Sequence, residues 1–170
     1  TLTSLTIHAN LELKDLTLLK DLPLTQLGLF RCSAVSDLTP LKGVNLTTLI
    51  VSETAVSNLE PLRGMPLKAL HARCDKLSDL GPIAGMKLDT LDLEHSAVPD
   101  LTPLKGMPLR TVNLTNCKKL TDLSPLAPAT VTIGEAIGSP VGLPWLEHLS
   151  LDFNPVTDLS PLAELVNLKS

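Results

Sequence analysis

The ten residues DLTPLKGMPL, at positions 100–109, recur along the chain in three closely similar copies. These copies are DLTPLKGVNL at 37–46, NLEPLRGMPL at 58–67 and DLGPIAGMKL at 79–88, so successive copies start 21 residues apart. A shorter form, DLSPLA, stands at 122–127 and again at 158–163. Self-similarity at a fixed short period is typical of repeat architectures, so the chain is predicted to fold as a stack of equivalent units.

The second half of each unit is predicted to form a short helical turn with defined ends. An aspartate such as Asp100 can accept a backbone N–H at its start, and a proline three residues later costs no hydrogen bond there. A glycine such as Gly106 suits the left-handed conformation that ends the turn, whereas a phosphate-binding loop would need several glycines that open a helix. The structural positions are the aspartates Asp37, Asp79, Asp100, Asp122 and Asp158, the prolines Pro40, Pro61, Pro82 and Pro103, and the glycines Gly43, Gly64, Gly85 and Gly106.

The first half of each unit alternates as a strand does. It has the pattern L-x-x-L-x-L, as in Leu88, Leu91 and Leu93, and this alternation predicts a strand with one buried face. Units start at residues 2, 24, 46, 67, 88, 109 and 146, so the last interval is longer than the others. A helical turn that leads from one strand to the next parallel strand is expected to be a right-handed crossover.

The strand pattern resembles that of leucine-rich repeats. The V-x-D-L-x-P-L continuation is similar to the short 21–22-residue class found in internalins and phosphatase-regulator-type repeats, and the GMPL join resembles arrays beside kinase domains in some large bacterial proteins. The resemblance covers nearly the whole chain. It implies an α/β fold, a right-handed leucine-rich-repeat solenoid in a single domain over 1–170, with a parallel sheet on the concave face and 3₁₀ or one-turn helices on the convex face. It also implies a protein-binding function.

Residues 128–145, PATVTIGEAIGSPVGLPW, interrupt the pattern. The segment TVTIG still alternates, with Val131 and Ile133 facing inward, and predicts an eighth strand. The rest of the interruption lacks the capping aspartate and the PLKG turn. It is either a degenerate repeat with an irregular loop or a protruding loop that contacts a partner. Trp145 is expected to pack against the solenoid.

Composition and charge argue against several classes of protein. The net charge is −4 with acids and bases mixed, so no surface for nucleic acid is expected. No apolar run approaches the length of a membrane span, so no membrane insertion is expected. No signal peptide is visible and no initiator Met is present, which favours a piece of a longer protein. Flanking repeats or domains are expected to cover both ends, since neither shows an evident polar cap.

Side chains between the strand leucines should face solvent in three columns on the concave side. Two of these side chains, Phe30 and Ile50, are apolar. Two pairs that can interact as opposite charges are expected between adjacent units. The apolar Phe30 is either an anchor for a partner or a cover for a neighbouring side chain. The pairs are either a polar recognition patch or ordinary charge pairing on a solvated face. The candidate binding residues are Phe30, Ile50, the pair His71 and Asp92, and the pair Arg73 and Glu94.

No metal, cofactor or catalytic site is expected. The best-placed group of metal-ligating side chains is His71, Asp92, Glu94 and His95. However, His95 directly follows Glu94 and should point away from it, so the four side chains would not converge on one ion. No nucleophile stands beside a base at a recognisable spacing, so the chain is not expected to be an enzyme.

The three cysteines stand in or near the slot that follows a strand. The nearest pairs are two units apart, about 9.6 Å along a sheet, whereas a disulfide needs Cα atoms within about 7 Å. Cys32, Cys74 and Cys117 are therefore expected to be free thiols packed at strand exits. Unpaired thiols favour a reducing, cytoplasmic compartment.

Three functions follow as hypotheses. The favoured one is a module that binds a protein partner on its concave face, because a rigid array displays side chains in fixed register. The alternative is a structural spacer or scaffold segment in a larger multidomain bacterial protein, kinase-linked or on the surface. A third is an enzyme or small-ligand domain centred on His71 and Asp92.

Overall fold

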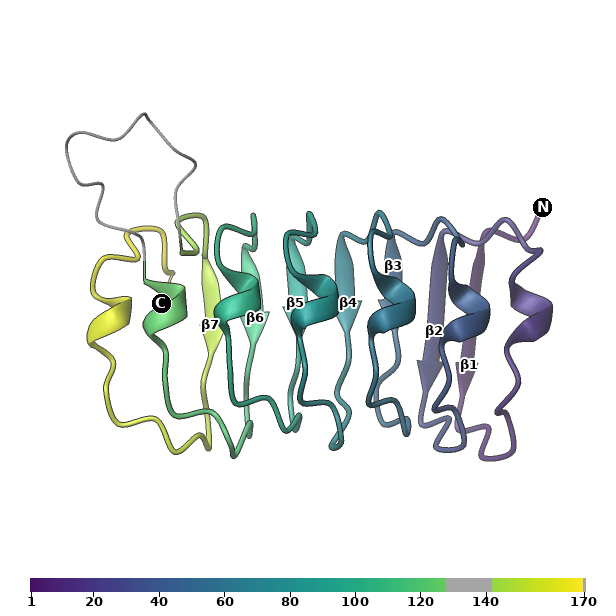
Figure 1. The fold of residues 1–170 in the computed structure, drawn as a ribbon, viewed down its shortest axis with the longest axis horizontal. Coiled ribbons are helices and arrows are strands. Elements are labelled where there is room, and N and C mark those ends of the chain that lie inside the picture. Colours follow the sequence, from purple (N-terminus) through teal and green to yellow (C-terminus); the bar gives the residue numbers. More distant parts are fainter. Residues whose placement is uncertain (128–141, 170) are drawn as a thin grey trace.

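The computed structural model describes residues 1–127 and 142–169, which form successive turns of a solenoid (Figure 1). Each turn has one short strand and one 3₁₀ helix, and the helices form a layer in front of the strands in Figure 1. The strands are β1 (Ser4–His8), β2 (Gln26–Phe30), β3 (Thr48–Ile50), β4 (Ala69–His71), β5 (Thr90–Asp92), β6 (Thr111–Asn113) and β7 (His148–Ser150). The helices are η1 (Thr17–Leu19), η2 (Thr39–Leu41), η3 (Glu60–Leu62), η4 (Gly81–Ile83), η5 (Thr102–Leu104), η6 (Ser124–Leu126) and η7 (Ser160–Leu162). Within these ranges no helix has the length and apolar character needed to cross a bilayer.

The strands form one parallel sheet in sequence order, from β1 to β7. Each strand pairs with the next in the register that the leucine alignment predicts, so that Leu49 pairs with Leu70 and Leu70 with Leu91. The predicted solenoid and its parallel sheet are therefore confirmed. Because the register is constant, equivalent positions of successive turns line up in columns across the sheet.

The helical half of the unit follows the predicted local rules. In each turn an aspartate or asparagine side chain accepts the backbone N–H two residues ahead, at the first residue of the 3₁₀ helix. For Asp100 this acceptor lies 2.8 Å from the Thr102 nitrogen, and Asn58 takes the same role for Glu60. The distance is also 2.8 Å for Asp37, Asp79, Asp122 and Asp158. The capping function of these aspartates is confirmed.

The predicted glycines close the helices in left-handed geometry. Gly43, Gly64, Gly85 and Gly106 have φ between 71° and 83°. Before these glycines the backbone is extended, as at Lys105, where ψ is 130°. After η7, where a glutamate replaces the glycine, Ala163 remains helical with ψ of −28°. These glycines therefore supply the left-handed conformation with which the four joins turn towards the next strand.

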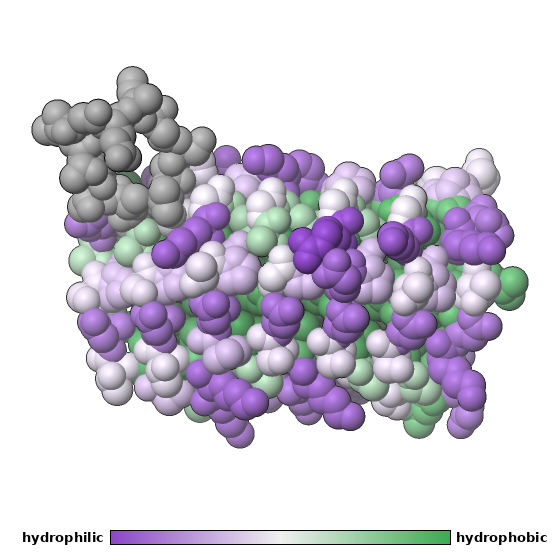
Figure 2. Space-filling view, in the orientation of Figure 1, coloured by the Kyte–Doolittle hydropathy of each residue, from purple (hydrophilic) through white to green (hydrophobic). Residues whose placement is uncertain are grey.

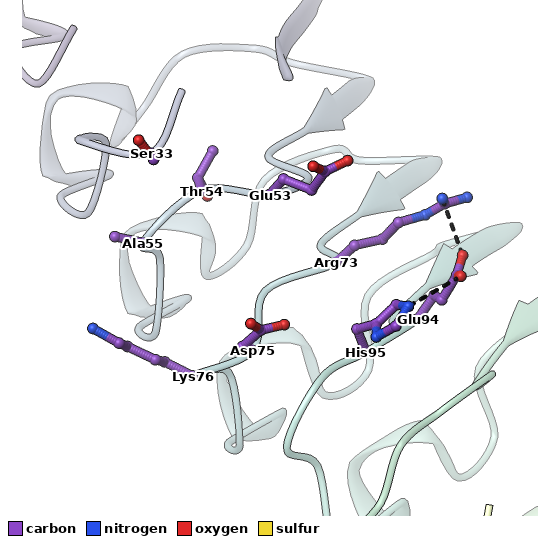
Figure 3. A pocket seen from close by; sticks show the side chains of 9 residues that line it. All are labelled: Ser33, Glu53, Thr54, Ala55, Arg73, Asp75, Lys76, Glu94 and His95. Carbon is purple, nitrogen blue, oxygen red and sulfur yellow. Dashed lines mark ion pairs between the residues drawn. The ribbon is translucent and has the colours of Figure 1, made fainter. Parts of the chain in front are cut away.

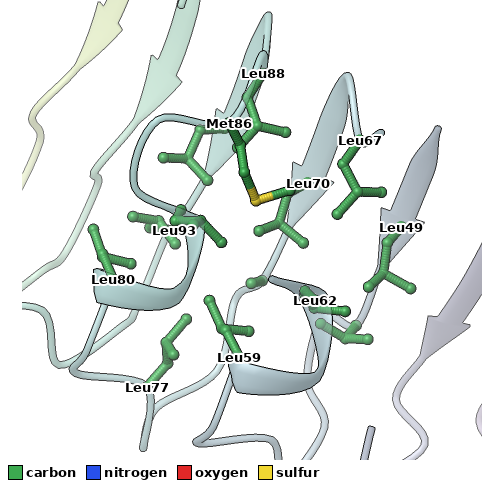
Figure 4. Close-up of a cluster of buried hydrophobic side chains, with 14 of the residues drawn as sticks. Leu49, Leu59, Leu62, Leu67, Leu70, Leu77, Leu80, Met86, Leu88 and Leu93 are labelled. Atoms are coloured by element: carbon green, nitrogen blue, oxygen red, sulfur yellow. The ribbon is translucent and has the colours of Figure 1, made fainter. Parts of the chain in front are cut away.

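The core is one continuous stack of aliphatic side chains between the sheet and the helices (Figure 4). In most turns the strand leucines meet the two leucines on either side of the helical proline, and Leu59, Leu62 and Leu70 are all fully buried. Figure 4 shows side chains from neighbouring turns interleaved, with Met86 filling space between them. The outer surface of the helices carries mainly hydrophilic side chains with smaller apolar areas between them (Figure 2).

A second buried feature lies where the strands end. The Cys74 thiol donates to the Val51 carbonyl at 3.0 Å, and the Cys117 thiol donates to the Leu93 carbonyl at 3.2 Å. Asn154 does the same for the Leu114 carbonyl at 2.9 Å. Each of these carbonyl groups also accepts a bond from its own turn, from the Thr54 hydroxyl, the Ser96 N–H and the Cys117 N–H respectively, so the side chains add a second bond that links successive turns.

All three cysteines are free and buried, as predicted. Burial raises the pKa of the Cys74 thiol and of the Cys117 thiol, because a thiolate would lose its hydration. The two thiols are therefore held in the protonated form that can donate to a carbonyl, and their role here is structural.

The prediction of an eighth strand in the sheet is wrong in one respect. β6 pairs directly with β7, with Val112 opposite Leu149, so no strand lies between them. Among the described residues of the long interval η6 is the only helix, and the turn of solenoid that holds β7 and η7 follows it. β7 is therefore the strand that follows β6 in the sheet. The segment TVTIG itself, with Val131 and Ile133, and the two interpretations of the interruption lie outside the described residues.

Candidate functional site

The exposed side of the sheet, which we call the strand face, displays side chains from all seven strands. Its first two columns are in the predicted register, since Thr48 pairs with Ala69 and Ile50 pairs with His71. The first column is Ser4, Gln26, Thr48, Ala69, Thr90, Thr111 and His148, and the second is Thr6, Gly28, Ile50, His71, Asp92, Asn113 and Ser150. The strand face thus brings all six candidate residues onto one surface or its strand-end edge.

The Phe30 side chain is held by two neighbours on the strand face. Its ring stacks on the ring of His8, with centroids 4.7 Å apart and planes within 3° of parallel. Its Cε2 atom would lie only 3.1 Å from a Cβ at position 28, so Gly28 leaves the room that the ring occupies. Phe30 is half-buried by these contacts. The sequence analysis missed both partners, although a glycine inside a strand signals close approach of another group.

Asp92 is the centre of a charged cluster on β4 and β5. It is only 5% exposed, and its Oδ2 atom lies 2.7 Å from Arg73 Nε and 3.4 Å from His71 Nδ1. Arg73 also reaches Glu94, with Nη1 3.0 Å from Oε2. Both predicted pairs are therefore confirmed. The shortest contact, between Arg73 and Asp92, runs diagonally across the strands and was not predicted.

The cluster keeps the Asp92 carboxylate ionised. Burial alone would raise the pKa of Asp92, but hydrogen bonds from His71 and Arg73 and from the Glu94 N–H hold that pKa below its ordinary value. The Glu94 nitrogen lies 3.2 Å from Asp92 Oδ1. Every oxygen of this buried carboxylate thus has a donor, which is the condition for a buried charge to be tolerated. As a result, Arg73 is fixed in one orientation with its other face open to solvent.

His95 corrects one prediction. It was expected to point away from Glu94, yet its Nε2 atom lies 3.5 Å from Glu94 Oε1. The reason is that His95 has a φ of 64°, in the left-handed region, where the alternation of an extended strand no longer holds. Its Nδ1 atom lies 2.7 Å from the side-chain nitrogen of Asn116 on the next turn. In the described part of the chain no group of three or more His, Cys, Asp or Glu side chains is arranged to hold a metal ion.

An open depression of about 590 Å³ borders this cluster where the strands end (Figure 3). Arg73, Glu94 and His95 form one wall, and Glu53, Asp75 and Lys76 lie across from them in Figure 3. Glu53 in turn pairs with Arg31 at 3.0 Å. The sequence analysis did not single out Glu53, Asp75 or Lys76. What these three residues share in the sequence is their position, because each stands within three residues after the last strand-face position of its turn.

Comparison with known proteins supports the fold. No protein-family model matches the chain, and no curated protein matches it. Among solved structures, an internalin (inlF) from Listeria monocytogenes has 26% sequence identity and a TM-score of 0.78, over 92% of this chain and 43% of its own. An internalin C2 (inlC2) from the same organism has 31% identity and a TM-score of 0.82, over 98% of this chain and 69% of its own.

These similarities cover nearly the whole chain. The chain spans less than half the length of the first internalin and about two thirds of the second. Similarity at this identity over nearly the whole chain, together with the capped 3₁₀ turn and the seven-stranded parallel sheet, identifies its relatives. The chain belongs to the internalin family of leucine-rich repeat proteins.

Proposed function

We propose that the chain is a protein–protein interaction module that binds a partner on its strand face. The observation that carries the proposal is the cluster in which the buried Asp92 holds Arg73 in place. Membership of the internalin family supports an interaction module in general terms. The strand face adds the specific surface, with Phe30 on β2, Ile50 on β3 and the charged cluster next to them in the turns of β4 and β5.

Preorganisation is the physical basis of this proposal. An arginine side chain normally loses rotamer freedom on binding, which costs about 0.5–1.5 kcal/mol. Arg73 is already held by Asp92 and Glu94, yet 43% of its side chain is exposed. Arginine and aromatic residues are the residues that most often dominate binding energy at interfaces. A fixed arginine and a fixed aromatic ring on one rigid sheet are therefore suited to bind a partner with little loss of entropy.

The alternative, a structural spacer, is favoured by a different observation. The hydroxyl of Thr25 lies 3.2 Å from the Thr3 carbonyl, and that of Thr47 lies 3.1 Å from the Thr25 carbonyl. These threonines link successive turns along one edge and serve the scaffold itself. A spacer would not need a charged cluster at the ends of the strands, so we favour the interaction module.

The experiment that tests the proposal compares strand-face variants with a matched control. Phe30→Ala and Arg73→Ala should each weaken binding of one and the same partner by about 30-fold or more, as truncation of a dominant contact residue does. Lys20→Ala removes an exposed cation beside η1 and should leave binding unchanged. Partners are identified by capture and mass spectrometry, and affinities are then measured by calorimetry.

A folding control is needed because Arg73→Ala leaves Asp92 without its closest donor. Arg73→Lys keeps the positive charge near Asp92 while it removes the planar fork, so it should fold normally and still bind more weakly. Circular dichroism and thermal denaturation verify the fold of each variant. Unchanged affinity in Phe30→Ala and in Arg73→Lys would assign the binding to another surface and favour the spacer.

A further inference from the structure

The two long edges of the solenoid, where strands begin and where they end, differ in charge. Strands run from the upper to the lower edge in Figure 1. The four joins that lead into β3, β4, β5 and β6 are residues 42–47, 63–68, 84–89 and 105–110, and Asp89 is their only acidic residue. The same joins carry the basic residues Lys42, Arg63, Lys68, Lys87, Lys105 and Arg110. The strand-start edge of these turns is therefore strongly basic although the whole chain is acidic.

The strand-end edge of the same region has the opposite composition. The segments 31–37, 52–58, 73–79 and 94–100 contain three basic residues, Arg31, Arg73 and Lys76. They contain the acidic residues Asp37, Glu53, Asp75, Asp79, Glu94 and Asp100. Because the edges lie on opposite sides of the sheet, the solenoid presents two surfaces that attract different partners.

Two adjoining depressions lie along the basic edge. One of about 480 Å³ runs over the joins into β4 and β5, and one of about 290 Å³ continues from it towards Arg110 and Trp145. Lys68 and Lys87 line both depressions, so the two form one groove. Its apolar surface comes from Pro66, Pro108 and Trp145, and Trp145 is 40% exposed. Trp145 was expected to pack against the solenoid, but it does so only in part.

The charges in the groove are unequally compensated. Arg63 is held by Glu60 at 2.7 Å, and Arg110 lies 2.5 Å from Glu147 and 3.4 Å from Asp89. Lys68 and Lys87 have no ion pair with any carboxylate in residues 1–127 and 142–169. The middle of the groove therefore presents two cations that no carboxylate of the described residues pairs with, beside an exposed aromatic ring.

We propose that this groove binds an acidic peptide segment of a protein partner. Carboxylates of the segment pair with Lys68 and Lys87, and an apolar side chain packs against Trp145 and Pro108. The combination favours a peptide, because the apolar wall and the single exposed ring suit one anchoring side chain, whereas single-stranded nucleic acid needs successive aromatic platforms. The site is separate from the strand face, so the failure of either proposal leaves the other standing.

The structure supplies its own reporter for the test. Trp145 is the only tryptophan and the chain has no tyrosine, so intrinsic fluorescence reports on this groove alone. The probe is a fluorescein-labelled decapeptide that alternates glutamate and leucine, and the matched probe replaces each glutamate with glutamine. Binding of the acidic probe should change the Trp145 emission and raise the anisotropy of the label, and added salt should weaken it.

Two double variants locate the binding. Lys68→Glu with Lys87→Glu should weaken binding of the acidic probe by about tenfold or more, because both cations become repulsive. Lys118→Glu with Lys119→Glu makes the same change of charge at two exposed lysines on the strand-end side and should leave binding unchanged. All four lysines are exposed, so both variants should fold, which circular dichroism verifies.

Several results would overturn the proposal. They are equal binding of the glutamine probe, equal loss in both double variants, no change in Trp145 emission, or no binding at millimolar probe. A single-stranded oligonucleotide that binds as tightly as the peptide would show a general polyanion site, and the assignment to a peptide would then be wrong.

Discussion

The hexapeptide DLSPLA occurs twice in this protein, at 122–127 and at 158–163, and the two copies share a capped 3₁₀ helix but differ in burial. Both form a 3₁₀ helix, η6 and η7, and in both the aspartate accepts a serine N–H at 2.8 Å. Yet Leu123 is 1% exposed in the first copy, whereas its equivalent, Leu159, is 57% exposed in the second.

The difference arises from neighbouring turns. η6 packs between η5 and η7, whereas among the described elements η7 packs against η6 on one side. The two copies therefore form the same capped helix but bury different amounts of apolar surface, and their last residues diverge, with ψ of 136° at Ala127 and −28° at Ala163. In a solenoid the local sequence specifies the shape of a turn, and the turns on both sides of it supply the burial that stabilises it.

The largest expected difference between the two copies comes from the same substitution at their equivalent leucines. Leu123→Ala should lower the free energy of unfolding by about 2–5 kcal/mol, as leucine truncation in a packed core does. Leu159→Ala should lower it by less than about 1 kcal/mol, because most of that side chain is already in water. Urea denaturation measures both. Equal losses would mean that burial by neighbouring turns does not control stability.

The position after the helix also differs between turns, because its backbone is left-handed where it holds glycine and is not left-handed after η7. Gly85→Ala should lower the free energy of unfolding by about 1–2 kcal/mol, because alanine is strained at a φ of 71°. An added Cβ at this position meets no atom within 4 Å, so the cost is conformational alone. Glu164→Ala, at the equivalent position after η7, should change stability by less than about 0.5 kcal/mol, since Glu164 is not left-handed. Thermal denaturation of both variants checks this, and similar shifts in melting temperature would contradict it.

Loss of a capping aspartate should have the same effect on hydrogen exchange at the capped residue in both copies, but a different effect on the free energy of unfolding. Asp122→Ala removes the acceptor for the Ser124 N–H and should lower the free energy of unfolding by about 1 kcal/mol. Asp158→Ala removes the same bond at Ser160 and should mainly increase local opening of η7. Hydrogen exchange should therefore quicken at Ser124 and at Ser160 in the respective variants, while urea denaturation should shift clearly in Asp122→Ala alone.

The smallest expected effect is the acid dependence of the caps. Hydrogen bonds from Thr102 hold the pKa of Asp100 below its ordinary value, and hydrogen bonds from Ser160 do the same for Asp158. A lowered pKa in the folded state means that this stabilisation is present above the unfolded pKa of about 3.9 and is lost as pH falls through the folded pKa. Amide exchange at Thr102 and Ser160 should quicken between about pH 4 and pH 2. Asp158→Asn should remove this dependence at Ser160 but not at Thr102, and a persistent dependence at Ser160 would refute the assignment.

Most of the fold was predictable because the signals act within one turn. The positions of Asp100, Pro103 and Gly106 indicated the start and the end of η5, and the leucine alignment predicted the strand register. The expected eighth strand was not found between β6 and β7, because a strand joins this sheet only if its neighbours pair with it. Alternation in TVTIG carries no information about that pairing.

The candidate site was predictable in part. Column positions placed His71 beside Asp92 and Arg73 near Glu94, and both contacts are present. The shorter contact between Arg73 and Asp92 was missed because a long side chain can reach diagonally to a neighbour of another column. The direction of His95 was wrong because its left-handed backbone ends the alternation on which the prediction depended.

The sequence by itself determined the repeat, the capped turn, the glycine-ended joins and the free cysteines, since each depends on residues a few positions apart or on a constant spacing. Only the tertiary structure decided which copy of DLSPLA is buried, how Asp92 and Arg73 meet, and how Lys68 and Lys87 come to share a groove with Trp145. The physical reason is the distance along the chain over which each interaction acts. Backbone preferences and caps act within a turn, whereas burial, ion pairing and grooves depend on side chains that neighbouring turns bring together.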